Sequence, residues 1–250
     1  MTPPTKTATQ SSLGRDWVGC RSTGGGAVVV EYCMGQGYIS SGGRNLRRRH
    51  MLLVCVMALA CSRPAHGQSE AEILIAAMQD GGKVIYLRHA ATNQNEIDTG
   101  RLGDRAAQRN LSPAGIQQAR ELGRTFRTLL IPLDDILASP VFRARDTAEL
   151  AFGATRIMVT MDLVADEYAG GQLRNMLDAT GRLLRTPPRP GTNRLLIGHR
   201  TPLEMVTGRP FPDNVLPEGA MAVFLPSAGE PRLLGTVSAQ RLMHSAEVRR

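Results

Sequence analysis

Cysteine is absent from residues 68–250. The first 67 residues hold all four cysteines of the chain: Cys20, Cys33, Cys55 and Cys61. Their spacing fits neither a disulfide framework nor a zinc site. The sequence therefore predicts a main body without disulfides, which suits either an oxidising or a reducing compartment.

A large excess of positive charge is also absent from the main body. Residues 68–250 contain 22 Lys and Arg against 20 Asp and Glu, a net charge of +2, which leaves +6 of the total of +8 to the first 67 residues. Proteins that bind a polyanion along their surface carry a clustered basic excess. The composition therefore gives little support to nucleic-acid binding.

Long apolar runs and repeated units are missing as well. The chain has no internal repeat and no coiled-coil heptad, which argues against a solenoid or a long coiled coil. Its longest apolar run, residues 51–61, is too short to cross a bilayer as a permanent helix.

This apolar run has the surroundings of a secretory signal peptide, which we assign to residues 46–67. The basic cluster Arg47-Arg48-Arg49 precedes it, and Ala65-His66-Gly67 provides a small-x-small exit before Gln68. A lipoprotein anchored at Cys61 has less support, because the three residues before this cysteine depart from the usual Leu-Ala-Gly type.

The remaining regions follow from this assignment. Residues 1–45, rich in Gly, Ser and Thr, are either disordered or the product of a start codon chosen too early. Residues 68–250 then form the mature domain, which we expect in the periplasm or outside the cell. Amino-terminal sequencing of the protein from its host tests this prediction, and recovery of intact residues 1–67 from the cytosol would contradict it.

In the main body, an apolar run stops abruptly at Arg88 and His89. Residues 84–87 have the composition of a short buried strand, and Gly81-Gly82 precede them. Ligand crevices of open α/β sheets lie at the carboxyl ends of the strands. The two side chains are therefore candidates for a site, although a single histidine after a strand is more often structural.

Two further segments repeat the arrangement. Residues 193–198 lead to His199, and the short strand at residues 136–138 leads to Ser139 and Pro140, a predicted helix start with Arg143 in its first turns. Neighbouring parallel strands would bring two histidines and two arginines together. Arginine forks match phosphate oxygens and a neutral imidazole can attack phosphorus, so we expect a phosphorylated guest.

The segments between these strands predict the fold. Helical spacing of apolar residues occurs at residues 70–79, 112–129 and 175–184, and a further strand is predicted at residues 156–160. The alternation predicts one α/β domain, a three-layer sandwich whose central, mostly parallel sheet has helices on both faces. Between the first strand and the second of these helices lies a polar loop, residues 93–110, whose arginines either select a substrate or are simply solvated: Arg101, Arg105 and Arg109.

Several motifs in chain order resemble the histidine phosphatase superfamily of the phosphoglycerate mutase-like, branch 1 type. Residues 88–95 match Arg-His-Gly-x-Thr-x-x-Asn except that Ala90 replaces glycine, and residues 111–119 match Leu-Ser/Thr-x-x-Gly-x-x-Gln-Ala. The Ser-Pro-x-x-Arg-x-x-x-Thr-Ala element is residues 139–148, and the Gly-His element is residues 198–199. Residues 218–224 resemble the last strand of the family, so the resemblance covers roughly residues 80–225.

The resemblance implies a mechanism and its residues. His89 is the expected nucleophile and forms a phosphohistidine, while Arg88, Arg143 and His199 hold the phosphoryl oxygens. Thr92 and Asn95 match family positions that line the pocket. No metal or other cofactor is expected, and the expected partner is a small phosphorylated substrate or a phosphoprotein.

One departure concerns the proton donor. Many family members carry Leu-x-Glu where this chain has Leu163-Val164-Ala165. Asp166 and Glu167 follow at once; Glu167 is our preferred donor, but both are also consistent with solvated loop charges.

Three more residues are of interest for their positions. Arg145 points to another face of its helix than Arg143 and is expected to meet a neighbouring carboxylate or water. Arg200, directly after the second histidine, either extends the anion site or lies on the surface. His244 is expected to be solvated in a polar tail.

Two functions are therefore compared. The first is an exported phosphomonoester phosphatase acting through phosphohistidine, which the two arginines and two histidines favour. The alternative is a catalytically weak relative that binds phosphorylated ligands, which the missing family glutamate favours.

Overall fold

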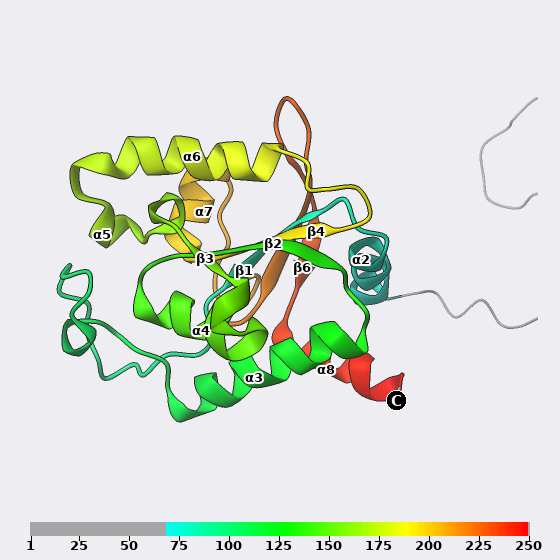
Figure 1. Ribbon diagram of the computed structural model, residues 1–250, viewed down its shortest axis with the longest axis horizontal. Helices are drawn as coiled ribbons and strands as arrows, with labels where there is room; N and C mark the ends of the chain where they lie inside the picture. Colours follow the sequence, from blue (N-terminus) through cyan, green and yellow to red (C-terminus); the bar gives the residue numbers. More distant parts are fainter. Residues whose placement is uncertain (1–68, 250) are drawn as a thin grey trace, which may run out of the picture. The chain divides into compact units, whose positions relative to one another are not determined.

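The computed structural model describes residues 69–249 (Figure 1). The predicted signal peptide, the segment before it and all four cysteines lie outside the described residues. Within the described part, no helix has the length and apolar character needed to cross a membrane.

A six-stranded sheet forms the centre of the domain, in the order β3-β2-β4-β1-β5-β6. Neighbouring strands among β3, β2, β4 and β1 pair in parallel, whereas β5 runs antiparallel to β1 and β6 antiparallel to β5. The prediction of a mostly parallel sheet is confirmed. The strands are β1 (Val84–Arg88), β2 (Leu133–Ala138), β3 (Met158–Val159), β4 (Asn193–Gly198), β5 (Met221–Leu225) and β6 (Arg232–Val237).

Helices cover both faces of the sheet, as the predicted three-layer sandwich requires (Figure 1). Those on one face are α2 (Glu70–Gln79), α3 (Pro113–Thr128), α4 (Phe142–Phe152) and α8 (Ala239–Val248). Those on the other are α6 (Leu173–Arg185) and α7 (Arg200–Thr207), with the short α5 (Asp166–Ala169) leading to them. Single 3-10 turns complete the set: η1 (Arg105–Ala107), η2 (Ala154–Arg156), η3 (Met161–Leu163) and η4 (Gly170–Gln172).

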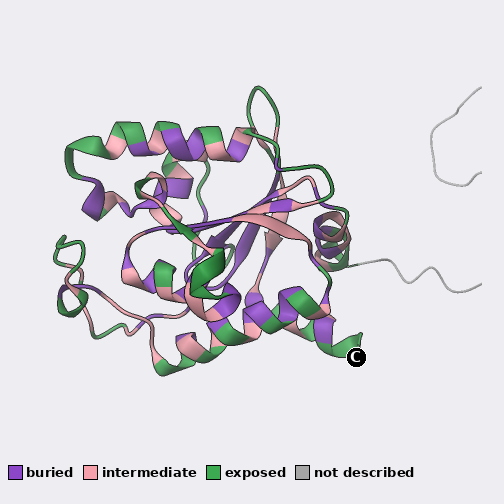
Figure 2. Cartoon of the chain, viewed as in Figure 1, coloured by how far each residue is buried: buried purple, intermediate pink, exposed green. Residues whose placement is uncertain are grey.

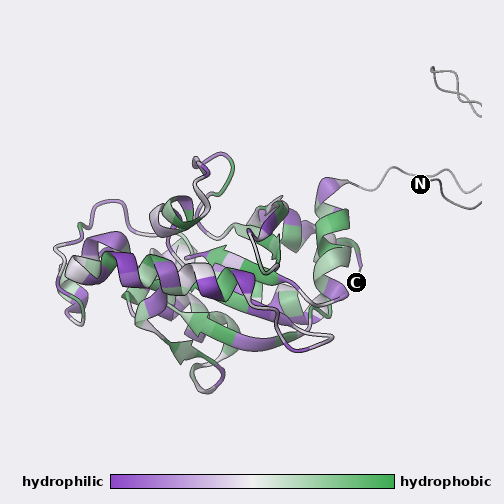
Figure 3. Ribbon diagram, turned by 90° about the horizontal axis from the view of Figure 1, so that it is seen from above, coloured by the Kyte–Doolittle hydropathy of each residue, from purple (hydrophilic) through white to green (hydrophobic). Residues whose placement is uncertain are grey.

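Strand β1 connects the two halves of the core. Its alternate side chains point to opposite faces, so Ile85 and Leu87 pack with α2, α3, α4 and α8, while Val84 and Tyr86 pack with α6 and α7. Every residue of β1 is buried, which explains why the strand reads as a continuous apolar run (Figure 2). The helices instead carry hydrophilic and hydrophobic bands, since each has one face toward the sheet and one toward solvent (Figure 3).

Two helix starts agree with the sequence patterns. Ser69 caps α2 in a reciprocal pair of hydrogen bonds with Glu72. The Ser112 hydroxyl accepts a hydrogen bond from the Gly115 backbone N–H at 3.0 Å, with Pro113 at the first helical position of α3.

The prediction that Ser139 caps a helix is wrong. Helix α4 begins at Phe142, and its N-cap residue, Val141, makes no side-chain cap bond. The Ser139 hydroxyl instead accepts a hydrogen bond from the Val141 backbone N–H at 3.2 Å and is hydrogen-bonded to His199 Nε2. It therefore interacts with a site residue and does not cap the helix. Arg143 nevertheless lies in the first turn of α4, as expected.

The chain after residue 225 also differs from its predicted form. Strand β6 and helix α8 follow β5, which is not the last strand, and His244 is exposed on α8 rather than in an unstructured tail. Leu242 and Ala246 of this helix are buried in the core. Strand β6 is hard to recognise because its pairing with β5 is irregular and Gly235 interrupts it. Strand β3 was predicted at residues 156–160 but spans only Met158–Val159. The 3-10 turn η2 includes Arg156, the first residue of the predicted strand.

Helices α3 and α4 cross at a glycine, which provides a test of the packing. A Cβ added at Gly123 would come within 3.0 Å of three backbone atoms of Ala151, which no side-chain rotation can relieve. We expect Gly123→Ala to lower the free energy of unfolding by up to about 2 kcal/mol, because an overpacking cost near the upper end of about 1–3 kcal/mol outweighs the gain of about 1 kcal/mol in helix propensity. Urea denaturation measures this.

Gly229→Ala is the control, since a Cβ there meets open space. Equal midpoints for the two variants would show that α3 and α4 can separate without cost.

Candidate active site

The site lies where β1 and β4 end side by side. Arg88 pairs with Gly198 in the sheet, and the His89 backbone N–H donates to the Gly198 carbonyl at 3.1 Å. His89 and His199 therefore follow adjacent strand ends, with ring centroids 5.4 Å apart and planes inclined by 52°. The Ser139 N–H donates to the Ile197 carbonyl at 2.9 Å, which brings the end of β2 to the same edge.

Hydrogen bonding fixes the state of the His89 ring. Its Nδ1 lies 2.9 Å from the Ala90 carbonyl oxygen, which can only accept, so Nδ1 carries the proton and Nε2 keeps a free lone pair. Burial, and then the nearby positive charge of Arg143, lower the pKa of His89 well below its ordinary value of 6.5. The ring is neutral at neutral pH, the form that can act as a nucleophile.

His199 is buried beside it. Its Nε2 lies 2.8 Å from the Ser139 hydroxyl, and the Tyr86 hydroxyl bonds to both its backbone N–H and its carbonyl. Burial is also the main cause of its lowered pKa, followed by Arg143 and His89. This second imidazole is neutral as well.

Four buried nitrogen atoms of the site have no hydrogen-bond partner. Buried polar atoms are rarely left unpaired, so each such group needs an explanation. In the described part of the chain, only one other buried side-chain N or O atom, on Thr125, is in this condition. The four are Nε of Arg88, Nε of Arg109, Nε of Arg143 and Nδ1 of His199.

The outer nitrogens of the arginines are paired with carboxylates. Arg143 donates from Nη1 to Asp98 Oδ1 at 2.9 Å and from Nη2 to Glu167 Oε1 at 2.8 Å. Arg88 donates from Nη1 to Asp213 Oδ1 at 2.5 Å and to the Leu216 carbonyl at 2.8 Å. Both guanidiniums are almost fully buried, so these pairs offset the cost of desolvating them.

Arg109 belongs to the site; the sequence left it open between substrate selection and a solvated position and did not include it among the predicted site residues. Its positive charge contributes to the lowered pKa of both histidines, so it lies close to them. Its Nη2 and the Nη2 of Arg88 are each 4.0 Å from the same oxygen of Glu218. Of the three arginines in residues 93–110, Arg109 is the closest in sequence to Ser112. The Ser112 backbone N–H donates to the Ala91 carbonyl at 3.0 Å, which brings this part of the chain back to the motif that follows β1.

Glu218 is a second residue that was missed as part of the site. Its two oxygens accept from the Thr92 backbone N–H at 3.0 Å and from the Thr92 hydroxyl at 2.7 Å. Thr92 is therefore buried near the site, but its polar groups hold Glu218. The sequence offered one indication of this role, namely that Glu218 lies just before the predicted strand that became β5.

Asn95, predicted to line the pocket, is exposed in a turn. Its backbone N–H donates to the Asn93 side chain at 3.2 Å. Within residues 69–249, no hydrogen bond joins its side chain to the histidines or arginines of the site.

Replacement of the family glycine by Ala90 is accommodated. Ala90 is fully buried and its φ is not positive, so the position does not require glycine. Its N–H donates to the Thr147 hydroxyl at 2.9 Å, and that hydroxyl donates to the Arg143 carbonyl at 2.6 Å. Thr147 thereby links the turn after β1 to the first turn of α4.

The predicted acid segment lies beside Arg143. Ala165 is buried just before α5, whose first residues are Asp166 and Glu167. Desolvation, then a hydrogen bond to Glu167, raises the pKa of Asp166. Arg145 pairs with Glu149 at 2.7 Å, away from Arg143, as expected, and Arg200 lies 2.9 Å from Asp213.

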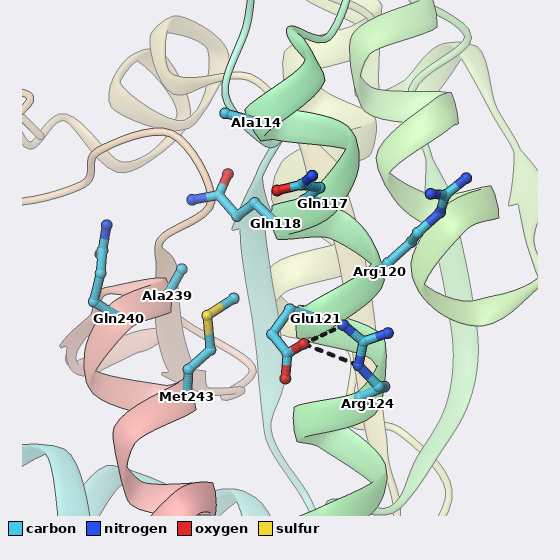
Figure 4. A pocket seen from close by; sticks show the side chains of 9 residues that line it. All are labelled: Ala114, Gln117, Gln118, Arg120, Glu121, Arg124, Ala239, Gln240 and Met243. Atoms are coloured by element: carbon cyan, nitrogen blue, oxygen red, sulfur yellow. Dashed lines mark hydrogen bonds and ion pairs between the residues drawn. The ribbon is translucent and has the colours of Figure 1, made fainter.

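Two other features of the described region take no part in this geometry. No group of three or more His, Cys, Asp or Glu side chains there is arranged to hold a metal ion. A hollow of about 580 Å³ between α3 and α8 contains none of the predicted site residues (Figure 4). Gln118 on its edge connects it to the first motif by accepting from the Ala91 N–H at 2.9 Å.

The arrangement is a neutral imidazole with a free Nε2 lone pair beside buried guanidiniums, a combination that suits phosphoryl transfer. The family model described as histidine phosphatase superfamily (branch 1) matches residues 84–187. Residues 84–187 are therefore similar to the histidine phosphatase superfamily, branch 1. This similarity supports a phosphatase function in general, that is, hydrolysis of phosphoesters.

Three solved structures are similar to this chain at low sequence identity. A phosphoserine phosphatase mutant from Entamoeba histolytica, in complex with phosphoserine, is 16% identical over 64% of this chain and 98% of its own, with a TM-score of 0.44. A putative α-ribazole-5′-P phosphatase from Escherichia coli is 15% identical over 64% and 98%, with a TM-score of 0.45. A putative phosphohistidine phosphatase SixA from Agrobacterium tumefaciens is 20% identical over 63% and 98%, with a TM-score of 0.43. No curated protein sequence matches the chain.

The two buried histidines predict a pH dependence of stability. Their pKa values lie well below 6.5 in the folded protein, so between the folded and the ordinary pKa the unfolded chain binds more protons. The free energy of unfolding should therefore be constant above pH 7 and fall from pH 7 to 5, by up to about 1.4 kcal/mol per pH unit for each proton. Urea denaturation across this range measures the slope.

His89→Asn and His199→Asn should each flatten this slope, whereas His244→Asn, on the exposed surface of α8, should leave it unchanged. A slope that persists in both site variants would place its origin in other groups.

Proposed function

We propose that the protein is a phosphomonoester phosphatase that acts through a phosphohistidine intermediate on His89. The observation that carries this proposal is the set of four unpaired nitrogens around the two histidines. A bound phosphoryl group supplies acceptor oxygens for the N–H groups among them, and three of the four belong to guanidiniums, which match phosphate geometry.

The reaction has two steps. Nε2 of His89 attacks phosphorus, forming a P–N bond while the ester P–O bond breaks and the alcohol leaves. A water molecule then attacks the phosphohistidine, releasing inorganic phosphate and restoring the imidazole. Arg88, Arg143 and His199 hold the equatorial oxygens and stabilise the charge on them, which is the main source of catalysis in such transfers.

Glu167 is the proposed proton donor to the leaving oxygen. It contacts Arg143 at 2.8 Å, and its side chain is 38% exposed, so a leaving group bound beside Arg143 can reach it. Desolvation, and then the hydrogen bond to Glu167, raise the pKa of Asp166, which favours a proton shared within this carboxyl pair and delivered through Glu167. The same pair then accepts a proton from the attacking water.

A catalytically weak, phospho-ligand-binding protein is the alternative. Ala165 is buried at the position where many family members carry the acid. In that case the unpaired nitrogens would hold a phosphorylated ligand that the protein does not turn over.

Covalent labelling tests the nucleophile. After a quench during turnover of a good aryl phosphate ester, wild-type protein should carry acid-labile, alkali-stable phosphate, and His89→Ala should carry none, because no other Nε2 in the pocket has the required free lone pair. Arg145→Ala, on the outer face of α4, serves as the control and should be labelled normally. Label that survives in His89→Ala would exclude this histidine as the nucleophile.

Substrate reactivity tests the acid. Alkoxide leaving groups need protonation, worth about 10² to 10⁴ in rate, whereas phenolates need it far less. Glu167→Gln should therefore lower kcat for alkyl phosphates about 100-fold or more relative to aryl phosphates. Asp166→Asn should have a smaller effect on the same ratio.

An unchanged alkyl-to-aryl ratio in both variants, together with good wild-type hydrolysis of alkyl esters, would mean that the donor lies elsewhere.

A further inference from the structure

Arg200 lies at the rim of the site, next to a residue of the phosphate pocket. It is the first residue of α7, directly after His199, and its side chain is 32% exposed. One oxygen of Asp213 lies 2.9 Å from Arg200 Nη1 and 2.5 Å from Arg88 Nη1. The two guanidiniums therefore face a common point that already holds an anionic oxygen.

Asp213 is a loosely held occupant of that point. Its side chain is 72% exposed, and the only hydrogen bonds and ion pairs that the described residues give it are those to the two arginines. Glu218, by contrast, is 17% exposed and receives both polar groups of Thr92. Of the two carboxylates beside Arg88, Asp213 is the one that can leave by a rotation of its own side chain.

The shared point differs from the phosphate pocket. Arg88, Arg109 and Arg143 all act on the pKa of both histidines, whereas Arg200 is not among the charges that do so. Arg200 instead contacts the oxygen of Asp213 that also bonds Nη1 of Arg88, whereas the Arg88 nitrogen assigned to the phosphate pocket is its unpaired Nε. The position of Arg200 suits a second negative group on the same ligand, because Arg88 lies between the phosphate pocket and the point shared with Arg200.

We propose that Arg200 and Nη1 of Arg88 form a second anion subsite, filled by Asp213 in the free protein, which selects phosphomonoesters that carry a further carboxylate or phosphate. This inference rests on the proposed function for its substrate class. The substrate's second anion replaces Asp213, so the two guanidiniums keep a partner throughout, and esters without such a group lose that contact.

Binding of non-hydrolysable ligands tests the subsite without requiring turnover. The ligands for calorimetry with the full-length chain are 3-carboxybenzylphosphonate, its neutral isostere 3-carbamoylbenzylphosphonate, and 1,3-xylylenebisphosphonate. We expect the two ligands with a second anionic group, the carboxylate and the bisphosphonate, to bind about fivefold more tightly than the amide, as suits a partly exposed pair of arginines. This preference should weaken as the salt concentration increases. Comparison of the carboxylate with the bisphosphonate shows which second anion the subsite prefers.

Variants assign the preference to its residues. Arg200→Gln should abolish it while leaving the affinity for the amide within about twofold, and Asp213→Asn should increase affinity for the carboxylate by removing its competitor. Arg209→Gln, which removes an equal charge from an exposed neighbouring position, should keep the full preference.

Equal affinities in the wild type, or a preference that survives Arg200→Gln, would overturn the subsite. Phosphohistidine formation and turnover of 3-carbamoylphenyl phosphate, measured in parallel, report on the proposed function alone. A protein that shows the binding preference without turnover retains the subsite and loses the phosphatase assignment.

Discussion

Burial of two arginines, Arg88 at the end of β1 and Arg143 in the first turn of α4, is the constraint on which the site depends. Removing a guanidinium from water is costly unless charge partners and hydrogen bonds replace the lost hydration. Arg88 and Arg143 meet this requirement with carboxylates on their outer nitrogens: Asp213 and, at 4.0 Å, Glu218 for the first, Asp98 and Glu167 for the second. Their Nε atoms remain buried and unpaired, so the free protein keeps hydrogen-bond donors near the two histidines that a ligand can satisfy.

The same arrangement determines the state of the histidines. Neighbouring positive charge disfavours a second positive charge, and burial acts in the same direction, so both rings stay neutral. A histidine of ordinary pKa would be largely protonated in mildly acidic surroundings and would lose its lone pair. The arginines therefore both favour an anionic ligand and keep the imidazoles neutral, the form that the proposed nucleophile requires.

Local patterns in the sequence were sufficient to predict most of this edge. Abrupt ends of apolar runs located the residues after β1 and β4, and Ser112 marked the start of α3, because each signal depends on a few adjacent residues. Arg109 and Glu218 could not be found in this way. Their positions depend on contacts between distant segments, such as the bond from the Arg109 N–H to Asp98 and the pairing of Thr92 with Glu218.

Ser139 shows that a contact between distant segments can also override a local sequence pattern. Its sequence context, followed by proline, has the pattern of a helix cap, yet a buried histidine nitrogen from another strand competes for its hydroxyl. The final strand and helix were missed for a related reason: the apolar residues of α8 become informative only once the edge of the sheet that they cover is known.

The reversed direction of β5 has a consequence for how such a site can diversify. Because β5 runs against β1, its beginning, rather than its end, lies at the edge with the histidines, where the Gly219 N–H donates to the His89 carbonyl at 2.8 Å. The loop before it, residues 208–217, thus enters the site from outside the parallel part of the sheet. Insertions or deletions in this loop would reshape one wall of the pocket while the register of every strand stays the same, so selectivity can change independently of the chemistry.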